Sequence, residues 1–316
     1  MSRSIAATRA ITRDLTPALK ADPEQRGDTR VWRWAASRTW YEHPAQTDAY
    51  NSLRNYPQYN AGMFDAEKQC FELNKQRIIE LLPAEFIIVD LGCGDAGKSI
   101  RLMKVAAASD KRSMLCPVDI SDVMLKEAMQ NARRARVRVT GPIKADFEIE
   151  LDKIVAEVSE KIPALYTIYA TICNFDIDAL LSKFQRTLKK KDMILFSTQL
   201  YGDDVAYIER QYEEEPVKRM ATEVMRSLGF EKTDINFGVR FNSARMEIEV
   251  YFIVNRVPDA IAKKYGVWSG DEIVVLYSCK PRLLELEEIA ERHLEDGEIF
   301  TNKAETFATI IGKLRK

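Results

Sequence analysis

The fold of this chain is decided by the stretch Phe86-Ile-Ile-Val-Asp-Leu-Gly-Cys-Gly-Asp-Ala-Gly-Lys-Ser99. Apolar residues lead into an acid, then a glycine-rich turn, then a helical pattern expected from about Lys98 to Ala107. A short apolar run bounded by turn residues is typical of a buried strand in a parallel sheet. Gly92 and Gly94 lack a Cβ, so backbone and ligand can approach closely. The first amides of the following helix would then face a ligand in the crevice.

The glycines alone leave the identity of that ligand open. Gly92, Gly94 and Gly97 fit the G-x-G-x-x-G pattern of dinucleotide-binding proteins. Asp90, two residues before the first glycine, favours a different ligand. A carboxylate there suits a ligand with an ammonium group, such as S-adenosylmethionine (SAM), and would repel a pyrophosphate. An ordinary strand–turn–helix connection is the third interpretation.

Composition limits the class of protein. The chain has 316 residues, of which 46% are hydrophobic and 30% charged, and its formal net charge is −1. We expect a globular, cytoplasmic protein that acts on a small molecule and has no general nucleic-acid or membrane surface. Five scattered cysteines favour a reducing compartment. With only two histidines, no metal site is expected.

Strands and helices alternate after the opening stretch. Further strands are expected at 114–118, 136–139, 165–172 and 193–200, and this order predicts an α/β fold with a Rossmann-like, doubly wound parallel sheet. The ligand should lie outside the carboxyl ends of the strands. The pattern changes after residue 201, where a polar helical region precedes strand-like runs at 234–254 and 272–278. A helix after Pro281 and a hairpin of 298–301 and 306–314 would close the sheet.

These patterns divide the chain into three expected parts. Residues 1–82 would form a leader and a helical cap, in which an aromatic cluster runs from Trp32 to Met63 and an amphipathic helix covers 64–82. Residues 83–201 together with 281–316 would form the ligand-binding domain. Residues 202–280 would form an inserted α+β substrate or lid domain.

Acidic residues at the ends of later strands extend the candidate ligand site. Asp119 ends the second strand, where a carboxylate can accept both ribose hydroxyls of SAM or of a dinucleotide. The alternative is a helix cap shared with Ser121. Asp146 offers an acceptor for an adenine amino group, and Phe147 a ring beside it.

Two further residues have both a functional and a plain structural interpretation. Lys98 begins the first helix and can neutralise a carboxylate of the ligand, or it can be a solvated helix lysine. Asn174 follows the fourth strand, where side chains that bind an acceptor project in such sheets, or it can cap the next helix.

Together these positions resemble one family. The matching segments are Phe86–Asp95 with Lys98, Pro117–Ile120, Ala145–Phe147, Ala170–Phe175 and Val275–Lys280. They are similar to class I SAM-dependent methyltransferases related to the ergothioneine-pathway enzyme that trimethylates the α-amino group of histidine. The resemblance runs from about Trp40 to the end of the chain.

The resemblance implies roles for individual residues. Residues that match SAM-binding positions of the family are Gly92, Lys98, Asp119, Asp146 and Phe147. Asn174 and Tyr212 match positions that hold the amino and carboxylate groups of the acceptor amino acid. Tyr59 matches an aromatic residue near the acceptor, and Ser278 a hydroxyl at the pocket.

Three departures from the family pattern bear on the acceptor. Asn60-Ala61-Gly62-Met63 replaces a Tyr-Pro-Thr-Arg segment, and Cys173 replaces a glycine. Leu276 stands where histidine-specific members have the acid that recognises imidazole. We therefore expect an amino-acid-like acceptor other than histidine, methylated at its α-amino nitrogen. Transfer or cyclisation of the aminocarboxypropyl arm of SAM, and SAM binding without catalysis, are the alternatives.

Overall fold

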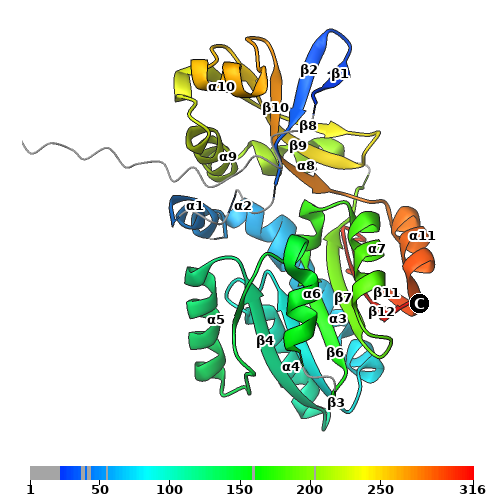
Figure 1. Ribbon diagram of the computed structural model, residues 1–316. Helices are drawn as coiled ribbons and strands as arrows, with labels where there is room; N and C mark the ends of the chain where they lie inside the picture. The colour runs from blue at the N-terminus through cyan, green and yellow to red at the C-terminus, as the bar shows by residue number, and fades with distance from the viewer. Residues whose placement is uncertain (1–21, 37–39, 41–43, 55, 159–160, 203) are drawn as a thin grey trace, which may run out of the picture.

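Two β-sheets form the framework of the computed structural model, which describes residues 22–36, 40, 44–54, 56–158, 161–202 and 204–316 (Figure 1). In spatial order the seven-stranded sheet contains β11 (Leu294–Thr301), β12 (Phe307–Leu314), β7 (Met193–Gln199), β6 (Ala164–Tyr169), β3 (Glu85–Leu91), β4 (Arg112–Asp119) and β5 (Ile143–Lys144). Strands β3 to β7 pair in parallel, and β12 runs antiparallel to β7. This confirms the predicted α/β fold with a doubly wound sheet.

Helices cover both faces of this sheet, which explains the continuous apolar sequence of β3. Ile87, Val89 and Leu91 point to one face. That face is covered by α6 (Phe147–Glu157), α7 (Ile177–Thr187) and α11 (Leu283–His293). Phe86 and Ile88 point to the other face. There they pack with α3 (Ala66–Leu81), α4 (Gly97–Ala108) and α5 (Asp122–Ala135).

The second sheet has five strands. In spatial order they are β1 (Glu24–Arg26), β2 (Thr29–Arg33), β10 (Glu272–Cys279), β9 (Glu247–Val254) and β8 (Ile235–Asn242). Strands β8, β9 and β10 pair antiparallel, as expected for the inserted segment. The sheet is accompanied by α8 (Val205–Glu213), α9 (Glu215–Ser227), the short 3₁₀ helix η4 (Lys232–Asp234) and α10 (Asp259–Tyr265).

Strands β1 and β2 lie in a segment for which the sequence predicts only a leader and a helical cap. They join the second sheet through β2, which runs parallel to β10. Trp32 and Trp34 bury their rings in the apolar core of that sheet. The Nε1 of Trp32 donates a hydrogen bond of 2.8 Å to Asp271. The strands form because burying these indoles compensates for the ordering of a short polar segment.

The expected helices of the N-terminal region are present, and the first two lie between the two sheets (Figure 1). They are α1 (Pro44–Arg54), α2 (Pro57–Tyr59), the π-helix η2 (Asn60–Asp65) and then α3. A Cβ on Gly62 would lie 2.0 Å from the side-chain nitrogen of Gln211. A larger residue at position 62 would therefore displace the Gln211 side chain of α8 from its present position.

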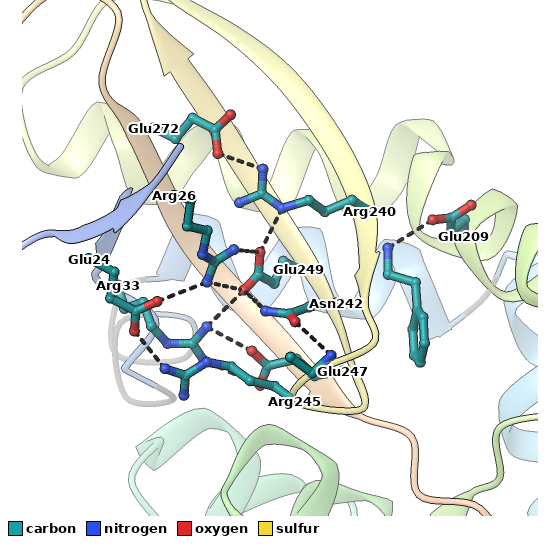
Figure 2. Close-up of polar contacts among 12 residues, drawn as sticks. Glu24, Arg26, Arg33, Glu209, Arg240, Asn242, Arg245, Glu247, Glu249 and Glu272 are labelled. Atoms are coloured by element: carbon teal, nitrogen blue, oxygen red, sulfur yellow. Dashed lines mark hydrogen bonds and ion pairs between the residues drawn. The ribbon is translucent and has the colours of Figure 1, made fainter. Parts of the chain in front are cut away.

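The polar face of the second sheet carries a network of ion pairs (Figure 2). Along β9, Glu247 and Glu249 alternate with residues of the apolar core. Glu249 is 0% exposed and accepts hydrogen bonds from Arg26, Arg33 and Arg240. This network ties β2, β8 and β9 together across the sheet. Among the described residues, no helix is both long enough and apolar enough to cross a membrane.

Candidate functional site

The candidate site lies at the carboxyl ends of β3, β4 and β6. A cavity of about 360 Å³ is lined by residues that include Glu67, Asp90, Lys98 and Tyr169. A smaller cavity of about 60 Å³ is lined by residues that include Ile120, Met124, Phe175 and the predicted Asp119, Asp146 and Phe147. Four residues line both cavities: Tyr50, Gly92, Gly94 and Thr171. An elongated ligand can therefore span both cavities across the glycine turn.

The glycine turn depends on backbone freedom and on close packing. Gly92 and Gly94 have φ angles of +66° and +52°, a region that residues with a Cβ seldom occupy. A Cβ on Gly92 would lie 3.3 Å from a Thr171 methyl and 3.6 Å from the ring of Phe147. A side chain at position 92 would therefore strain the turn and crowd Thr171, which lines both cavities.

Asp119 combines a structural contact with a place in the smaller cavity. Its two carboxylate oxygens accept backbone N–H bonds from Gly94 at 3.0 Å and Ser121 at 2.9 Å. Burial raises the pKa of Asp119, and these backbone donors partly offset it. Ser121 is the N-cap of α5, and its hydroxyl accepts from the amide of Met124, as predicted.

Asp146 and Phe147 follow β5 and begin α6. Asp146 caps the helix by accepting a 3.0 Å hydrogen bond from the amide of Glu148. Phe147 packs edge to face on Phe175, with ring centroids 5.3 Å apart. Both residues line the smaller cavity together with Asp119. A polar acceptor and an aromatic edge thus lie side by side there, as the sequence predicts.

Asp90 places a buried carboxylate against the larger cavity. The hydroxyl of Thr167 donates a 3.0 Å hydrogen bond to it. Burial raises the pKa of Asp90 to about 7, although hydrogen bonds from Ser99 and Thr167 partly offset this effect. The carboxylate is only partly ionised near neutral pH, and a cationic ligand beside it would favour the ionised form.

Lys98 has a partner that the sequence interpretation missed. Its ammonium group forms an ion pair with Glu67 of α3. It also lies 5.5 Å from the ring centroid of Phe64 and 5.2 Å from that of Tyr169. Ser197 donates a hydrogen bond to the buried Glu67. The available signal was that Glu67 lies on the apolar face of its helix, with Cys70, which predicts burial.

Tyr212 and Ser278 contact Lys280, to which the sequence interpretation gave no role, and Tyr59 packs on Tyr212. The rings of Tyr59 and Tyr212 meet edge to face, with centroids 6.4 Å apart. The ammonium nitrogen of Lys280 donates a 2.8 Å hydrogen bond to the Ser278 hydroxyl and lies 5.2 Å from the ring centroid of Tyr212. Three residues expected near an acceptor therefore lie together.

Asn174 and Leu276 line a separate cavity of about 10 Å³, and Trp40 is another of its walls. Leu276 lies on the same face of β10 as Ser278, because side chains alternate along a strand. Asn174 ends the 3₁₀ helix η3 (Ala170–Asn174), which replaces the last part of the predicted strand. The residues expected at the acceptor thus form two groups, joined by the shared face of β10.

The alternative that Asn174 caps the next helix is wrong. The N-cap of α7 is Asp176, whose carboxylate accepts a 3.0 Å hydrogen bond from the amide of Ala179. The chain leaves η3 at Phe175 in an extended conformation before α7 begins. Asn174 is therefore placed by η3, and its side chain lines the small cavity.

A family model described as "Histidine-specific methyltransferase, SAM-dependent" matches residues 37–314. The chain belongs to this family. It is a SAM-dependent methyltransferase, and SAM is its cofactor. The resemblance noted from the ordered sequence segments is confirmed. A search of curated proteins gave no match.

Several solved structures are similar to this methyltransferase at low sequence identity. The PH0226 protein from Pyrococcus horikoshii OT3 is 13% identical, with coverage of 78% of this chain and 90% of that one, at a TM-score of 0.43. A putative methyltransferase from Thermobifida fusca YX is 10% identical, with coverage of 87% and 90%, at 0.44. The complex of DhpI with SAM and HEP is 10% identical, with coverage of 87% and 99%, at 0.41.

The residues that line the two joined cavities have the chemistry that SAM requires. Asp119, Asp146 and Phe147 surround the smaller cavity, where hydroxyls and an adenine would find acceptors and a ring. Asp90 lines the larger cavity, where an ammonium group would find a carboxylate. Lys98 is already paired with Glu67, so it would meet a ligand carboxylate as part of an ion pair.

Proposed function

We propose that this methyltransferase methylates the α-amino nitrogen of an amino-acid-like acceptor whose side chain is apolar or weakly polar. The observation that carries the proposal is the wall of the small cavity around Leu276. It is formed by Ala35, Trp40, Asn174, Leu276 and Tyr277, and none of these described residues is a carboxylate. Histidine-specific relatives, by the resemblance above, present an acid at the position of Leu276.

An imidazole would find no adequate partner at Leu276. Burying its N–H against a leucine leaves the donor unsatisfied, which costs roughly 1–3 kcal/mol. Tyr277 also lines this cavity, but its ring is held by a cation–π contact. Its ring packs under the guanidinium group of Arg33, 4.8 Å from the ring centroid, toward the ion-pair face of the sheet. A site without the acid also loses discrimination in favour of polar side chains.

The residues of the chain would act mainly by positioning. SAM supplies an electrophilic methyl group, so the acceptor needs only a neutral amine held in line with it. Asn174 would orient this amine, and Tyr212 would hold the carboxylate of the acceptor. The proton of the ammonium form can leave to bulk water before the acceptor is enclosed. Exclusion of water by Trp40 and Tyr59 would then favour transfer.

The proposal is tested by incubating the protein with SAM and a panel of the protein amino acids, read by mass spectrometry. We expect a methylated apolar amino acid, fragmentation that places the methyl on the α-nitrogen, and S-adenosylhomocysteine as the second product. Methylthioadenosine in its place would show transfer of the aminocarboxypropyl arm and contradict methylation. SAM binding without any product across the panel would also contradict the proposal.

A further inference from the structure

Lys280 is a fully buried lysine without a carboxylate partner. It directly follows β10, and its side chain is 0% exposed. Its ammonium group donates to the Ser278 hydroxyl at 2.8 Å and faces the ring of Tyr212, with the centroid 5.2 Å away. Among the residues that the structure describes, no carboxylate lies within 4.0 Å of this ammonium group.

Among the described residues, Lys280 is the only buried lysine, and no arginine is buried. The buried carboxylates of Glu67 and Glu249 both have cationic partners, namely Lys98 and a set of three arginines. Burying an unpaired charge costs several kcal/mol, since the lost hydration is not replaced. A hydroxyl and the face of a ring satisfy part of the ammonium group but do not neutralise it. An anion bound beside Lys280 would therefore stabilise its buried charge.

The surroundings of Lys280 indicate which anion. Its two contacts, Tyr212 and Ser278, are residues that the family resemblance places at the acceptor, and Tyr59 packs against Tyr212. We propose that Lys280 binds the carboxylate of the acceptor, together with the hydroxyl of Tyr212. This rests on the proposed amino-acid acceptor and narrows it to molecules with a free carboxylate, excluding simple amines, esters and amides.

The burial of Lys280 gives this contact its selectivity. A carboxylate that neutralises the ammonium group forms charge-assisted hydrogen bonds in a site without water. An amine without a carboxylate would leave the lysine unpaired and would bring a second positive charge near it. Because the ammonium group is buried in this structure, acceptor binding must also open a path to it.

The test compares three probes of one shape, namely L-phenylalanine, phenethylamine and 3-phenylpropanoate. Binding is measured by calorimetry in saturating S-adenosylhomocysteine, for the wild type and for Lys280→Met. We expect the wild type to bind both carboxylates at least about tenfold more tightly than the amine. Lys280→Met should lose about 10- to 100-fold in affinity for the carboxylates and little for the amine.

Two controls separate binding from folding. Replacing an unpaired buried charge with an apolar side chain of similar length is neutral or stabilising, so Lys280→Met should melt no lower than the wild type. Lys111→Met removes a partly buried lysine that precedes β4 and donates to the Leu82 carbonyl. This lysine lies at the amino ends of the parallel strands, whereas the cavities lie at their carboxyl ends. That variant should keep the preference for carboxylates.

The outcomes distinguish this proposal from the proposed function. If no amino acid is methylated but 3-phenylpropanoate still binds in a Lys280-dependent manner, the proposed function fails and the carboxylate site stands. Three results would each overturn the role of Lys280. The first is an equal loss of affinity for acid and amine in Lys280→Met, and the second is a wild type that binds neither carboxylate. The third is a Lys280→Met protein that melts at a lower temperature and keeps its preference for carboxylates.

Discussion

The amide of Gly94 donates a 3.0 Å hydrogen bond to the carboxylate of Asp119. This contact joins the glycine turn after β3 to the end of β4, so the two parts of the candidate nucleoside site are fixed relative to one another. The same carboxylate lines the smaller cavity. Its second oxygen is oriented by the amide of Ser121 at 2.9 Å.

Replacing Asp119 with alanine should weaken SAM binding strongly. The variant would lack the charge-assisted hydrogen bonds between the Asp119 carboxylate and the ribose hydroxyls, which are worth roughly 2–3 kcal/mol. Calorimetric titration with SAM measures this loss. Asp122→Ala is the matched control, because Asp122 lies nearby but is exposed and pairs with Lys144. Unchanged affinity in a folded Asp119→Ala protein would remove Asp119 from the site.

The affinity for SAM should fall as the pH falls below about 7. Burial raises the pKa of Asp90 to about 7 in the free protein, and only the ionised form attracts an ammonium group. Below that pKa the affinity should drop by up to about tenfold per pH unit, because a proton must leave before the ligand binds. Titration between about pH 5.5 and 7.5 measures this slope. Asp90→Asn should bind weakly at every pH with a flat profile; an equally steep profile in Asp90→Asn would rule out this origin.

Removing the Asn174 side chain should lower turnover and leave SAM affinity nearly intact. Asn174 lines the cavity around Leu276 and is absent from the lining of the two cavities assigned to SAM. Loss of an orienting contact lowers kcat/KM by about 10- to 1000-fold. Asn236→Ala, an exposed asparagine on β8 that bonds to Asn255, should be neutral. Normal turnover in Asn174→Ala would exclude the orienting role.

The network of Figure 2 should make Glu249 important for stability. Burial opposes its ionisation, but hydrogen bonds from Arg26, Asn242 and Arg240 lower the pKa of Glu249 below its usual value of 4.5. Glu249→Gln would remove the carboxylate that the three arginines share and leave each with one remaining partner, namely Glu24, Glu247 or Glu272. Because a buried, charge-assisted network loses its central acceptor, we expect the protein to be destabilised by about 1–3 kcal/mol.

Urea unfolding at neutral pH measures this change. Because the pKa of Glu249 is lower in the folded state, its contribution is complete above about pH 4.5 and is lost as the pH falls through the lowered value. Glu72→Gln is the control, since the Glu72–Lys75 pair is exposed and worth less than about 1 kcal/mol. Equal stability of the two variants would contradict the role of the network.

The sequence predicts the parallel sheet well because its strands are buried on both faces and therefore contain uninterrupted apolar runs, such as residues 86–89 of β3. Strands β1 and β2 could not be predicted in this way. They carry Arg26 and Arg33, whose partners Glu247 and Glu249 lie more than 200 positions later. Glu24 likewise accepts a hydrogen bond from the distant Arg245. Such strands form only once the rest of the second sheet exists.

The candidate site divides in the same way. Asp90 and Asp119 follow from topology, since parallel strands bring their carboxyl ends to one edge. The burial of Glu67 could have been predicted from the apolar face of its helix, but its pairing with Lys98 could not. The burial of Lys280 could not be predicted, because it depends on elements that are distant in the sequence. A lysine at the end of an apolar strand usually lies in solvent, and only the contacts with Ser278 and Tyr212 place Lys280 inside the protein.

The central claim concerns Leu276, and the most direct test is the ratio of kcat/KM for histidine to that for the best other amino acid. We predict a ratio below about 0.1 in the wild type, because Leu276 offers an imidazole N–H no acceptor at the position where histidine-specific relatives present an acid. Leu276→Glu should raise this ratio by restoring an acceptor, whereas the control Leu276→Met should leave it low. A wild-type protein that methylates histidine at least as fast as every other amino acid would contradict the account.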